Sequence, residues 1–293
     1  MPDAEQSVAF ADALQRTASR TTLADAWHQS GARADALVLF REAEAMQAQL
    51  QPESPLLYSL QGFPYRDLLL GEAERIAWAT ILASNPAATE TPKLKLQLDT
   101  LCEVAQRAAQ AFIIADDYNW LLDIALDRLT LGRMAVYRAI LERSSSFAPA
   151  GDSLTAAVDG LRAAGAMDHL PRGFLTRTWL RIMEGDPAGA QADLDKAWQI
   201  AERGTMRLHL ADIHLHRARL FCEKPALAEA RKLIERCGYG RRKEELEDAE
   251  EAAKNWPEPQ PTNMFPPIPV EPQQPPTPSP AHEIARRLAQ SHR

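Results

Sequence analysis

Cysteines and long apolar runs are both scarce in this sequence of 293 residues, and each scarcity excludes a class of protein. The three cysteines, Cys102, Cys222 and Cys237, form no close-set pairs and match no metal-ligand spacing, which indicates free thiols in a reducing compartment. No apolar run approaches the roughly 20 residues that a membrane-spanning helix requires. The first ten residues, MPDAEQSVAF, lack the basic and apolar regions of a secretory signal. We therefore expect a cytoplasmic protein with no membrane partner.

Basic residues are outnumbered as well. The chain holds 33 lysines and arginines against 40 aspartates and glutamates, which gives a net charge of −7 and a pI near 5.6. Nucleic-acid-binding proteins usually carry a basic stripe, whereas the longest basic cluster here, residues 241–243, is followed at once by Glu244 and Glu245. That cluster favours a solvated helix start over a phosphate site. We expect no nucleic-acid partner.

Catalytic and metal-binding signatures are also missing. Without a Gly-Lys dipeptide the chain has no G-x-x-x-x-G-K-[ST] loop, and no Ser/His/Asp or Cys/His arrangement has a recognisable local signature. Only His209 and His216 of the cluster around His214 share a helix face, and they are seven residues apart, unlike the four of H-E-x-x-H. Asp123 and Asp127, one helical turn apart, favour a solvated helix face over an acid–base pair. We expect no enzyme activity, catalytic residue, cofactor or metal.

What the sequence does contain is helical periodicity. Alanine and leucine dominate residues 1–255, apolar residues recur with a period near 3.6, and clean alternation over strand lengths is absent. This pattern predicts an all-α fold, in which we expect Gly31, Gly71 and Gly132 to separate successive helices. The expected helices cover about 5–30, 35–49, 56–70, 72–83, 93–114, 120–131, 133–143, 152–166, 171–183, 187–203, 206–222, 225–237 and 241–255.

One spacing pattern occurs near the start and returns downstream. Residues of the glycine, small, large apolar and small types stand at offsets of 0, +5, +9 and +12, and such a frame is typical of repeated helix hairpins. It is found at Gly31, Ala36, Phe40 and Ala43, again at Gly185, Ala190, Leu194 and Ala197, and imperfectly at Pro225, Ala230, Ile234 and Cys237. Leu23, Ala24 and Trp27 precede the first copy and Pro52 follows it. We expect the alanines to lie where helices cross closely, and Trp27 and Phe40 to fill the space between hairpins.

These positions resemble the tetratricopeptide repeat, with uneven quality over residues 5–240. Thr178 stands where a small residue is expected, Pro225 replaces the glycine, and the period from Gly31 to Gly71 is 40 residues against the usual 34. The resemblance implies one domain over residues 1–255, built as a superhelical stack of antiparallel helix hairpins, an α-solenoid. It also implies a scaffold that binds a protein or peptide in its concave groove.

A narrower resemblance is to the helical-repeat blocks that follow the ATPase module in bacterial signalling NTPases of the NACHT and NB-ARC kind. The stretches LLYSLQGFPYRDLLL, NWLLDIALDRLTLGR and MRLHLADIHLHRARLF carry it. In that family the block senses a partner or mediates self-association. The resemblance therefore implies a detached repeat portion without its motor. The same helical pattern would also suit an α-helical enzyme or the sensing half of a transcription regulator.

In stacked hairpins, the first helix of each pair lines the concave groove, so its outward positions are the candidates for partner binding. Aromatic and arginine side chains are common anchors in such grooves, although Trp179 also suits the core. The predicted groove residues are Asp25, His28, Gln29, Tyr58, Gln61, Tyr65, Asn119, Arg172, Trp179, Asp212 and Arg219.

The composition changes abruptly after residue 255. Prolines crowd residues 256–281 with Glu, Gln and Thr between them, which predicts a disordered or polyproline II linker. P-x-x-P spacings at Pro266, Pro269 and Pro272 also allow a docking motif for an aromatic groove, but a spacer fits the composition better. The last residues, 282–293, allow a short basic helix that would dock on the body or bind a partner, and disorder of this segment is the alternative.

Overall fold

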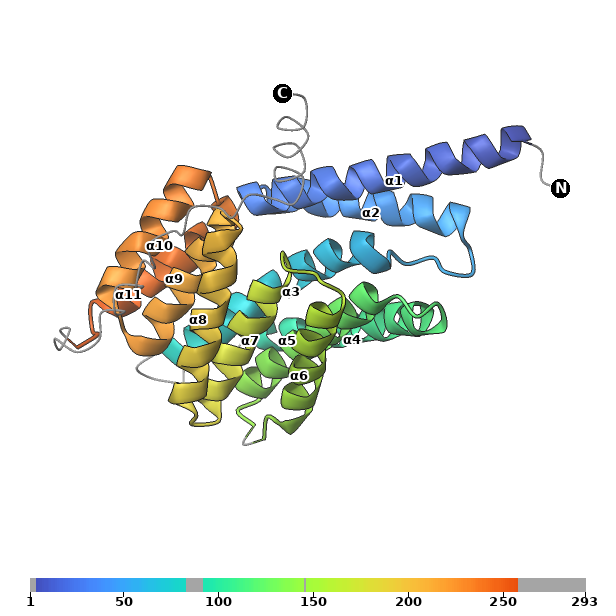
Figure 1. The fold of residues 1–293 in the computed structure, drawn as a ribbon. Helices are drawn as coiled ribbons and strands as arrows, with labels where there is room; N and C mark the ends of the chain where they lie inside the picture. The colour runs from blue at the N-terminus through green and yellow to red at the C-terminus, as the bar shows by residue number, and fades with distance from the viewer. Residues whose placement is uncertain (1–3, 83–91, 145, 258–293) are drawn as a thin grey trace, which may run out of the picture. The chain divides into compact units, whose positions relative to one another are not determined.

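The computed structural model describes residues 4–82, 92–144 and 146–257, and this part of the chain is all-α (Figure 1). The predicted fold class is confirmed, since these residues form helices and no strand. None of these helices is both long and apolar enough to cross a membrane. The predicted linker, from residue 258 onward, and the predicted helix at 282–293 lie outside the described residues.

Consecutive helices pack against each other along the chain, as in a solenoid. Contacts are most extensive within the pairs α1–α2, α5–α6, α7–α8 and α9–α10. The helices are α1 (Ala4–Ser30), α2 (Arg33–Leu50), α3 (Ser59–Leu82), α4 (Pro92–Asp117), α5 (Leu121–Leu141), α6 (Ala148–Ala163), α7 (Leu170–Met183), α8 (Pro187–Arg203), α9 (Arg207–Phe221), α10 (Lys224–Cys237) and α11 (Lys243–Ala253), with a 3₁₀ turn, η2 (Gly240–Arg242), before the last.

Two predicted helix breaks are wrong. Helix α3 continues through Gly71, and α5 continues through Gly132. A glycine inside a helix costs only about 1 kcal/mol relative to alanine, which the burial of neighbours such as Leu70 readily offsets. Gly132 has a packing role instead, because a Cβ atom there would lie 2.6 Å from Cδ2 of Leu154 on α6. Glycine at this position therefore lets α5 and α6 approach closely.

The first copy of the repeat pattern forms part of the core, but the two large side chains just before it, Leu23 and Trp27, are exposed. Ala24, Ala36, Phe40 and Ala43 are fully buried, as expected for positions between closely crossing helices. The indole of Trp27, in contrast, is 38% exposed, so the expectation that it fills the space between hairpins is wrong.

Helix α3 is buried among the other helices. It contacts α1, α2, α4, α5 and α11, and its side chains also meet α7 and α9. Figure 1 shows it running behind α7 and α8 toward α11. Phe63, Tyr65, Leu68 and Trp78 leave α3 in different directions, and each is at most 4% exposed. A helix that is apolar on most sides belongs in a core, so α3 occupies space that an open groove would leave to a partner.

Candidate protein-binding surface

The side chains predicted to line a groove differ widely in accessibility. Those buried are His28, Tyr65, Trp179, Asp212 and Arg219; those partly exposed are Asp25, Gln29, Tyr58, Gln61 and Arg172; Asn119 is exposed. The buried side chains lie against other parts of the same chain, and a partner would reach them only after neighbouring helices separate. That any of these residues binds a partner stays a prediction.

Several of the buried residues belong to an ionic cluster centred on Asp67 of α3. The Asp67 carboxylate is 1% exposed and accepts hydrogen bonds from Arg133 at 2.7 Å, from Arg172 at 3.1 Å and from Arg241 at 3.0 Å. Burial opposes ionisation, yet the three guanidinium groups, Arg241 foremost, hold the pKa of Asp67 well below its usual range. Asp67 thus joins α3, α5, α7 and η2.

Arg242 extends this cluster to the last helices. Its guanidinium donates to Asp212 at 2.8 Å and to Glu74 at 2.9 Å, and it also contacts Glu245, which binds Arg219 at 2.9 Å. All five side chains are at most 6% exposed. The prediction of a solvated helix start at residues 241–243 is therefore wrong for its arginines. Their charges are paired within the chain, which binds η2 and α11 to α3 and α9.

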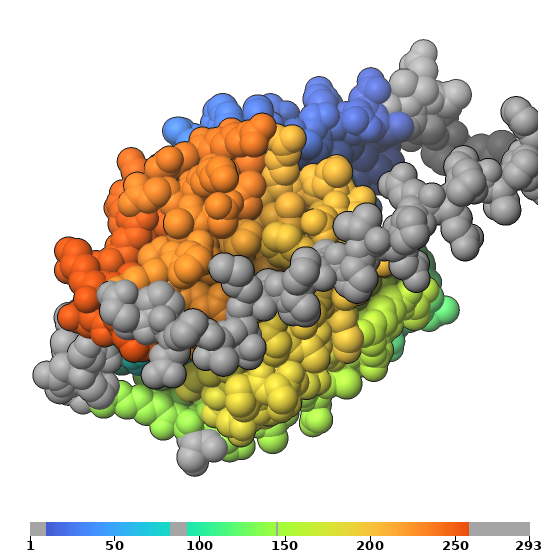
Figure 2. Space-filling model, turned by 60° about the vertical axis from the view of Figure 1, so that its left-hand side comes forward, coloured from blue at the N-terminus to red at the C-terminus, as the bar shows by residue number. Residues whose placement is uncertain are grey.

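The interior around this cluster is closely packed. A cavity of about 20 Å³ lies among Asp67, Glu74 and Arg133, which is room for about one water molecule. Beside it the indoles of Trp78 and Trp179 stack with their ring centroids 3.8 Å apart. Trp179 thus lies in the core, to which its large apolar side chain was also suited. Figure 2 shows the surface of α9–α11, in orange, directly against that of α7 and α8, in yellow.

The histidines of α9 face different neighbours. His209 Nε2 lies 2.9 Å from the backbone oxygen of Asp168, His216 Nδ1 lies 2.9 Å from that of Asp212, and His214 packs edge-on against Trp198. Among the residues that the structure describes, no group of three His, Cys, Asp or Glu side chains is placed to hold a metal ion. This segment of α9 therefore packs against the protein itself.

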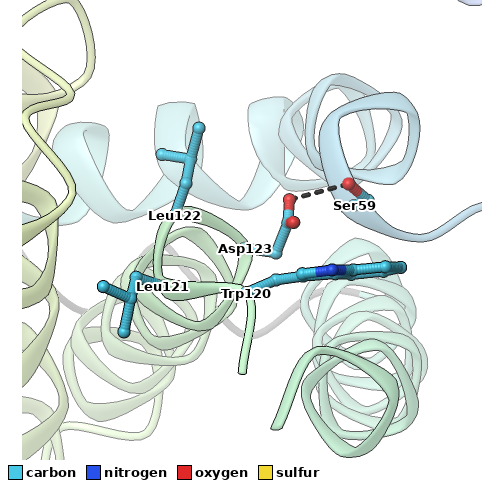
Figure 3. A pocket seen from close by; sticks show the side chains of 5 residues that line it. All are labelled: Ser59, Trp120, Leu121, Leu122 and Asp123. Atoms are coloured by element: carbon cyan, nitrogen blue, oxygen red, sulfur yellow. Dashed lines mark hydrogen bonds between the residues drawn. The ribbon is translucent and has the colours of Figure 1, made fainter. Parts of the chain in front are cut away.

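A pocket opens where α3 and α5 begin. It has a volume of about 330 Å³ and is lined by Ser59, Trp120, Leu121, Leu122 and Asp123 (Figure 3). The hydroxyl of Ser59 donates to the Asp123 carboxylate at 2.7 Å, and in Figure 3 the Trp120 indole extends beneath this pair. The pocket is shallow and open to solvent, so it suits a group that lies flat on it rather than one that it would enclose. We call it the aromatic pocket.

Three aromatic rings are gathered at the rim of the aromatic pocket. Tyr118 stacks on Trp120 with centroids 4.9 Å apart and planes 16° from parallel, and Tyr58 lies parallel within 9° at 6.4 Å. Tyr118 is 67% exposed and Trp120 39%. Leu60 and Leu121 beside them are about half exposed. Exposed apolar side chains that adjoin one another, unlike single ones, mark interaction surfaces.

The chain holds these rings in place before any partner arrives. Ser59 and Asn119 each adopt a left-handed backbone conformation, with φ of 55° and 54°, directly before or after a ring of the cluster. Asparagine tolerates this conformation, and Asn119 is the usual left-handed cap that ends α4, with the Trp120 N–H donating to the Ala115 oxygen at 2.9 Å. The Tyr58 hydroxyl donates to Gln51 at 2.9 Å. The aromatic pocket is thus built from two turns whose backbone conformations are fixed.

Beneath the pocket lies a buried ion pair between Arg66 and Asp127. Both side chains are 1% exposed, and Arg66 Nε and Nη1 and Asp127 Oδ2 have no hydrogen-bond partner within the described part of the chain. Burial raises the pKa of Asp127 to about 7, with Arg66 opposing and Asp123 adding to the shift. The expectation of a solvated face is therefore wrong for Asp127. Asp123, one turn earlier, reaches the pocket.

The sequence around the aromatic pocket is acidic. Residues 42–65 and 108–127 supply its rings and its carboxylate, and neither segment contains a lysine, an arginine or a histidine. Glu53, Asp116 and Asp117 on these segments are exposed. These exposed carboxylates favour cationic over acidic partners, although Arg41, Arg66, Arg107 and Arg128 directly flank the two segments.

Sequence reasoning selected two residues of this neighbourhood, Tyr58 and Asn119, and missed Tyr118, Trp120 and Asp123. A signal for them existed, because a Tyr-Asn-Trp triplet follows directly on a turn in a chain that is only 6% aromatic. Aromatic residues at a turn have no helix face along which to be buried. The structure also shows that Tyr58 joins this triplet from a segment about sixty residues earlier.

Comparison with known proteins identified no relative of this chain. No family model, no curated protein and no solved structure matches the chain.

Proposed function

We propose that this chain is a protein-interaction module, a scaffold that binds a peptide or protein partner at the aromatic pocket. The observation that carries the proposal is the set of three near-parallel rings, two of them well exposed, beside a shallow, open pocket of about 330 Å³. Rigid aromatic side chains supply much of the energy at protein interfaces because they bury a large area at little entropic cost. The proposal assigns no catalytic residue and no cofactor.

The relation to tetratricopeptide repeats remains part of this proposal. Sequential helix packing and the buried Ala24, Ala36, Phe40 and Ala43 support a repeat of that kind. The site differs from the concave groove of such repeats, because α3 fills the space between α5, α7, α9 and α11. A cytoplasmic location and the absence of nucleic-acid and membrane partners are expectations that go with it.

The proposal is tested by selecting peptides from a random library on the purified protein and measuring their affinities by calorimetry. We expect Trp120→Ala and Tyr118→Ala each to weaken the selected peptides by about ten-fold or more, as truncation of an aromatic anchor does. Phe10→Ala on α1 is the matched control, because its ring is exposed to nearly the same extent, 41% against 39%, and belongs to neither candidate surface. Circular dichroism confirms that each variant is folded. Selected peptides that bind Trp120→Ala as tightly as the parent would refute the site.

Self-association, as in the sensor blocks of signalling NTPases, is a second candidate. Leu23 and Trp27 favour it, because they stand one turn apart on α1 and are 46% and 38% exposed. Light scattering coupled to size exclusion should show an oligomer that Leu23→Gln with Trp27→Gln dissociates. A monomer at every concentration would exclude this candidate.

A further inference from the structure

We propose that the aromatic pocket recognises the guanidinium group of an arginine, so that its partner presents a basic peptide segment. This inference rests on the function proposed above and names the chemistry of its ligand. Its basis is the rings, the carboxylate and the charge of the surrounding chain.

The rings provide a face on which a guanidinium group can stack. Trp120 is the strongest type of side chain for a cation over a ring, and its indole is accessible over 39% of its surface. Guanidinium is planar and weakly hydrated, so it stacks on aromatic faces more readily than an ammonium group does. Tyr118 stacks on the indole at 4.9 Å and Tyr58 lies parallel to it at 6.4 Å, so these rings fix the indole in one orientation and leave to a guanidinium group the part that remains exposed.

The Asp123 carboxylate supplies the counter-charge. It lines the pocket together with Trp120, and its hydrogen bond from Ser59 at 2.7 Å fixes its direction. A carboxylate has about four lone-pair sites on two oxygens, so one hydrogen bond leaves capacity for a guanidinium donor. A ring and a carboxylate that are both already positioned suit a ligand with a flat charged head.

The protein itself contains this combination nearby. The guanidinium of Arg107 lies 5.1 Å from the centre of the Tyr65 ring and donates to Glu44 at 2.6 Å. There the arginine, the ring and the carboxylate all come from the same chain. At the aromatic pocket the ring and the carboxylate are present, and the partner would contribute the arginine.

The surrounding charge favours a cation over other ligands. Segments 42–65 and 108–127 hold acidic residues and no basic ones, and the guanidinium beneath the pocket, that of Arg66, is bound to Asp127. Arg66, Asp127 and Asp123 together carry one net negative charge when all are ionised. An acidic ligand would be repelled, and an aliphatic one would leave the Asp123 carboxylate desolvated without a partner.

The test uses three short peptides and the indole N–H signal of Trp120. Acetylated and amidated Gly-Ala-Arg-Ala-Gly is titrated into the ¹⁵N-labelled full chain, next to the same peptide with citrulline, a neutral isostere of arginine, or with lysine. The Trp120 signal is identified by its loss in Trp120→Ala. We expect a saturable shift for which arginine binds about ten-fold more tightly than citrulline, the size of a cation–aromatic contact reinforced by a carboxylate.

Variants separate the contributions. Asp123→Asn should weaken the arginine peptide several-fold and the citrulline peptide little, whereas Asp159→Asn, on an exposed face of α6, should change neither. Raising the salt concentration should weaken only the arginine and lysine peptides. Tyr118→Ala provides a second variant in case Trp120→Ala does not fold.

Three results would overturn the inference. Equal affinities for arginine and citrulline exclude charge recognition, and tighter binding of lysine excludes guanidinium stacking. Library peptides that depend on Trp120 but are acidic or aliphatic would leave the proposed function standing and reject the arginine ligand. Failure of every peptide to depend on Trp120 would instead reject the proposed function itself.

Discussion

Replacing Asp67 by asparagine should destabilise the fold strongly while leaving its shape almost unchanged. The substitution keeps the side-chain volume and removes one charge from a site that is 1% exposed. Three guanidinium groups, those of Arg133, Arg172 and Arg241, then face an amide in place of a carboxylate. Glu74 still pairs with Arg133 and Arg241, but the cluster gains one uncompensated positive charge, which keeps most of its desolvation cost.

The magnitude follows from comparable buried pairs. Removing one partner of a buried ion pair costs about 3–5 kcal/mol. For a folded region of this size each kcal/mol lowers the melting temperature by about 2–4 °C, so we expect Asp67→Asn to melt about 6–20 °C below the parent. The measurement is thermal unfolding followed by circular dichroism at 222 nm, at pH 7. Asp159→Asn is the control, because its pair with Arg162 is exposed and is worth less than about 1 kcal/mol.

A second substitution tests the mechanism. The side chain of Arg172 is 24% exposed, the most accessible of the three partners of Asp67. Arg172→Met removes one cation, so the double variant with Asp67→Asn should be more stable than the sum of the two single effects predicts. Additive effects, or an Asp67→Asn variant that melts within about 2 °C of the parent, would refute the view that uncompensated charge dominates this site.

Three further predictions concern other buried features. Gly240→Ala should lower the free energy of unfolding in urea by about 1–3 kcal/mol, because a Cβ atom there would lie 2.0 Å from the last carbonyl oxygen of α1. Gly71→Ala should raise the free energy of unfolding by about 0.5–1 kcal/mol, because Gly71 lies inside a helix with open space around it. Replacing Arg66 by methionine should leave Asp127 protonated and without a hydrogen-bond partner, because Arg66 opposes the burial that raises the pKa of Asp127, so we expect a cost of about 1–3 kcal/mol in the same assay. Adding Asp127→Leu should restore or exceed the parent stability, and a double variant no more stable than the single one would contradict this. Burial, reinforced by nearby guanidinium groups, lowers the pKa of His28 to about 2, so below pH 6.5 only the unfolded state takes up a proton on this residue, and about 2 kcal/mol of stability should be lost by pH 5. The urea midpoint of the parent should therefore fall between pH 7 and pH 5, and His28→Gln should remove the part of that fall that is due to this residue. An unchanged fall in His28→Gln would disprove the prediction.

Local patterns predicted most helices well. The expected span 187–203 coincides with α8, and 225–237 differs from α10 by one residue. At these ends the sequence carries strong signals, such as a proline in the first turn and a glycine after the last. Gly71 and Gly132 are also glycines, but they lie inside helices and end none. In the sequence a glycine that ends a helix cannot be told from one that admits a close neighbour, as Gly132 does, or from one with open space around it, as Gly71 has.

The candidate site was predicted only in part, for a physical reason. Tyr58 and Asn119 were selected by their places on expected helices, yet they lie near the pocket because two turns, each with a left-handed residue, meet there. Trp120 and Asp123 belong to the candidate site because these two turns lie together. Trp120 has one local signal, its place in a Tyr-Asn-Trp triplet at a turn, whereas nothing local distinguishes a pocket carboxylate such as Asp123 from a surface one.

Residue patterns along the chain were sufficient to predict the all-α class, the sequential packing of helices and the buried alanine and phenylalanine positions, because helical period and small-residue spacing act over short distances. Contacts between distant segments place α3 in the interior, bury the arginines of residues 241–243 against Asp67 and Glu74, and unite aromatic residues sixty positions apart in one pocket. A charged side chain is solvated or buried according to its partners, and those partners are distant in sequence. Only folding brings them together.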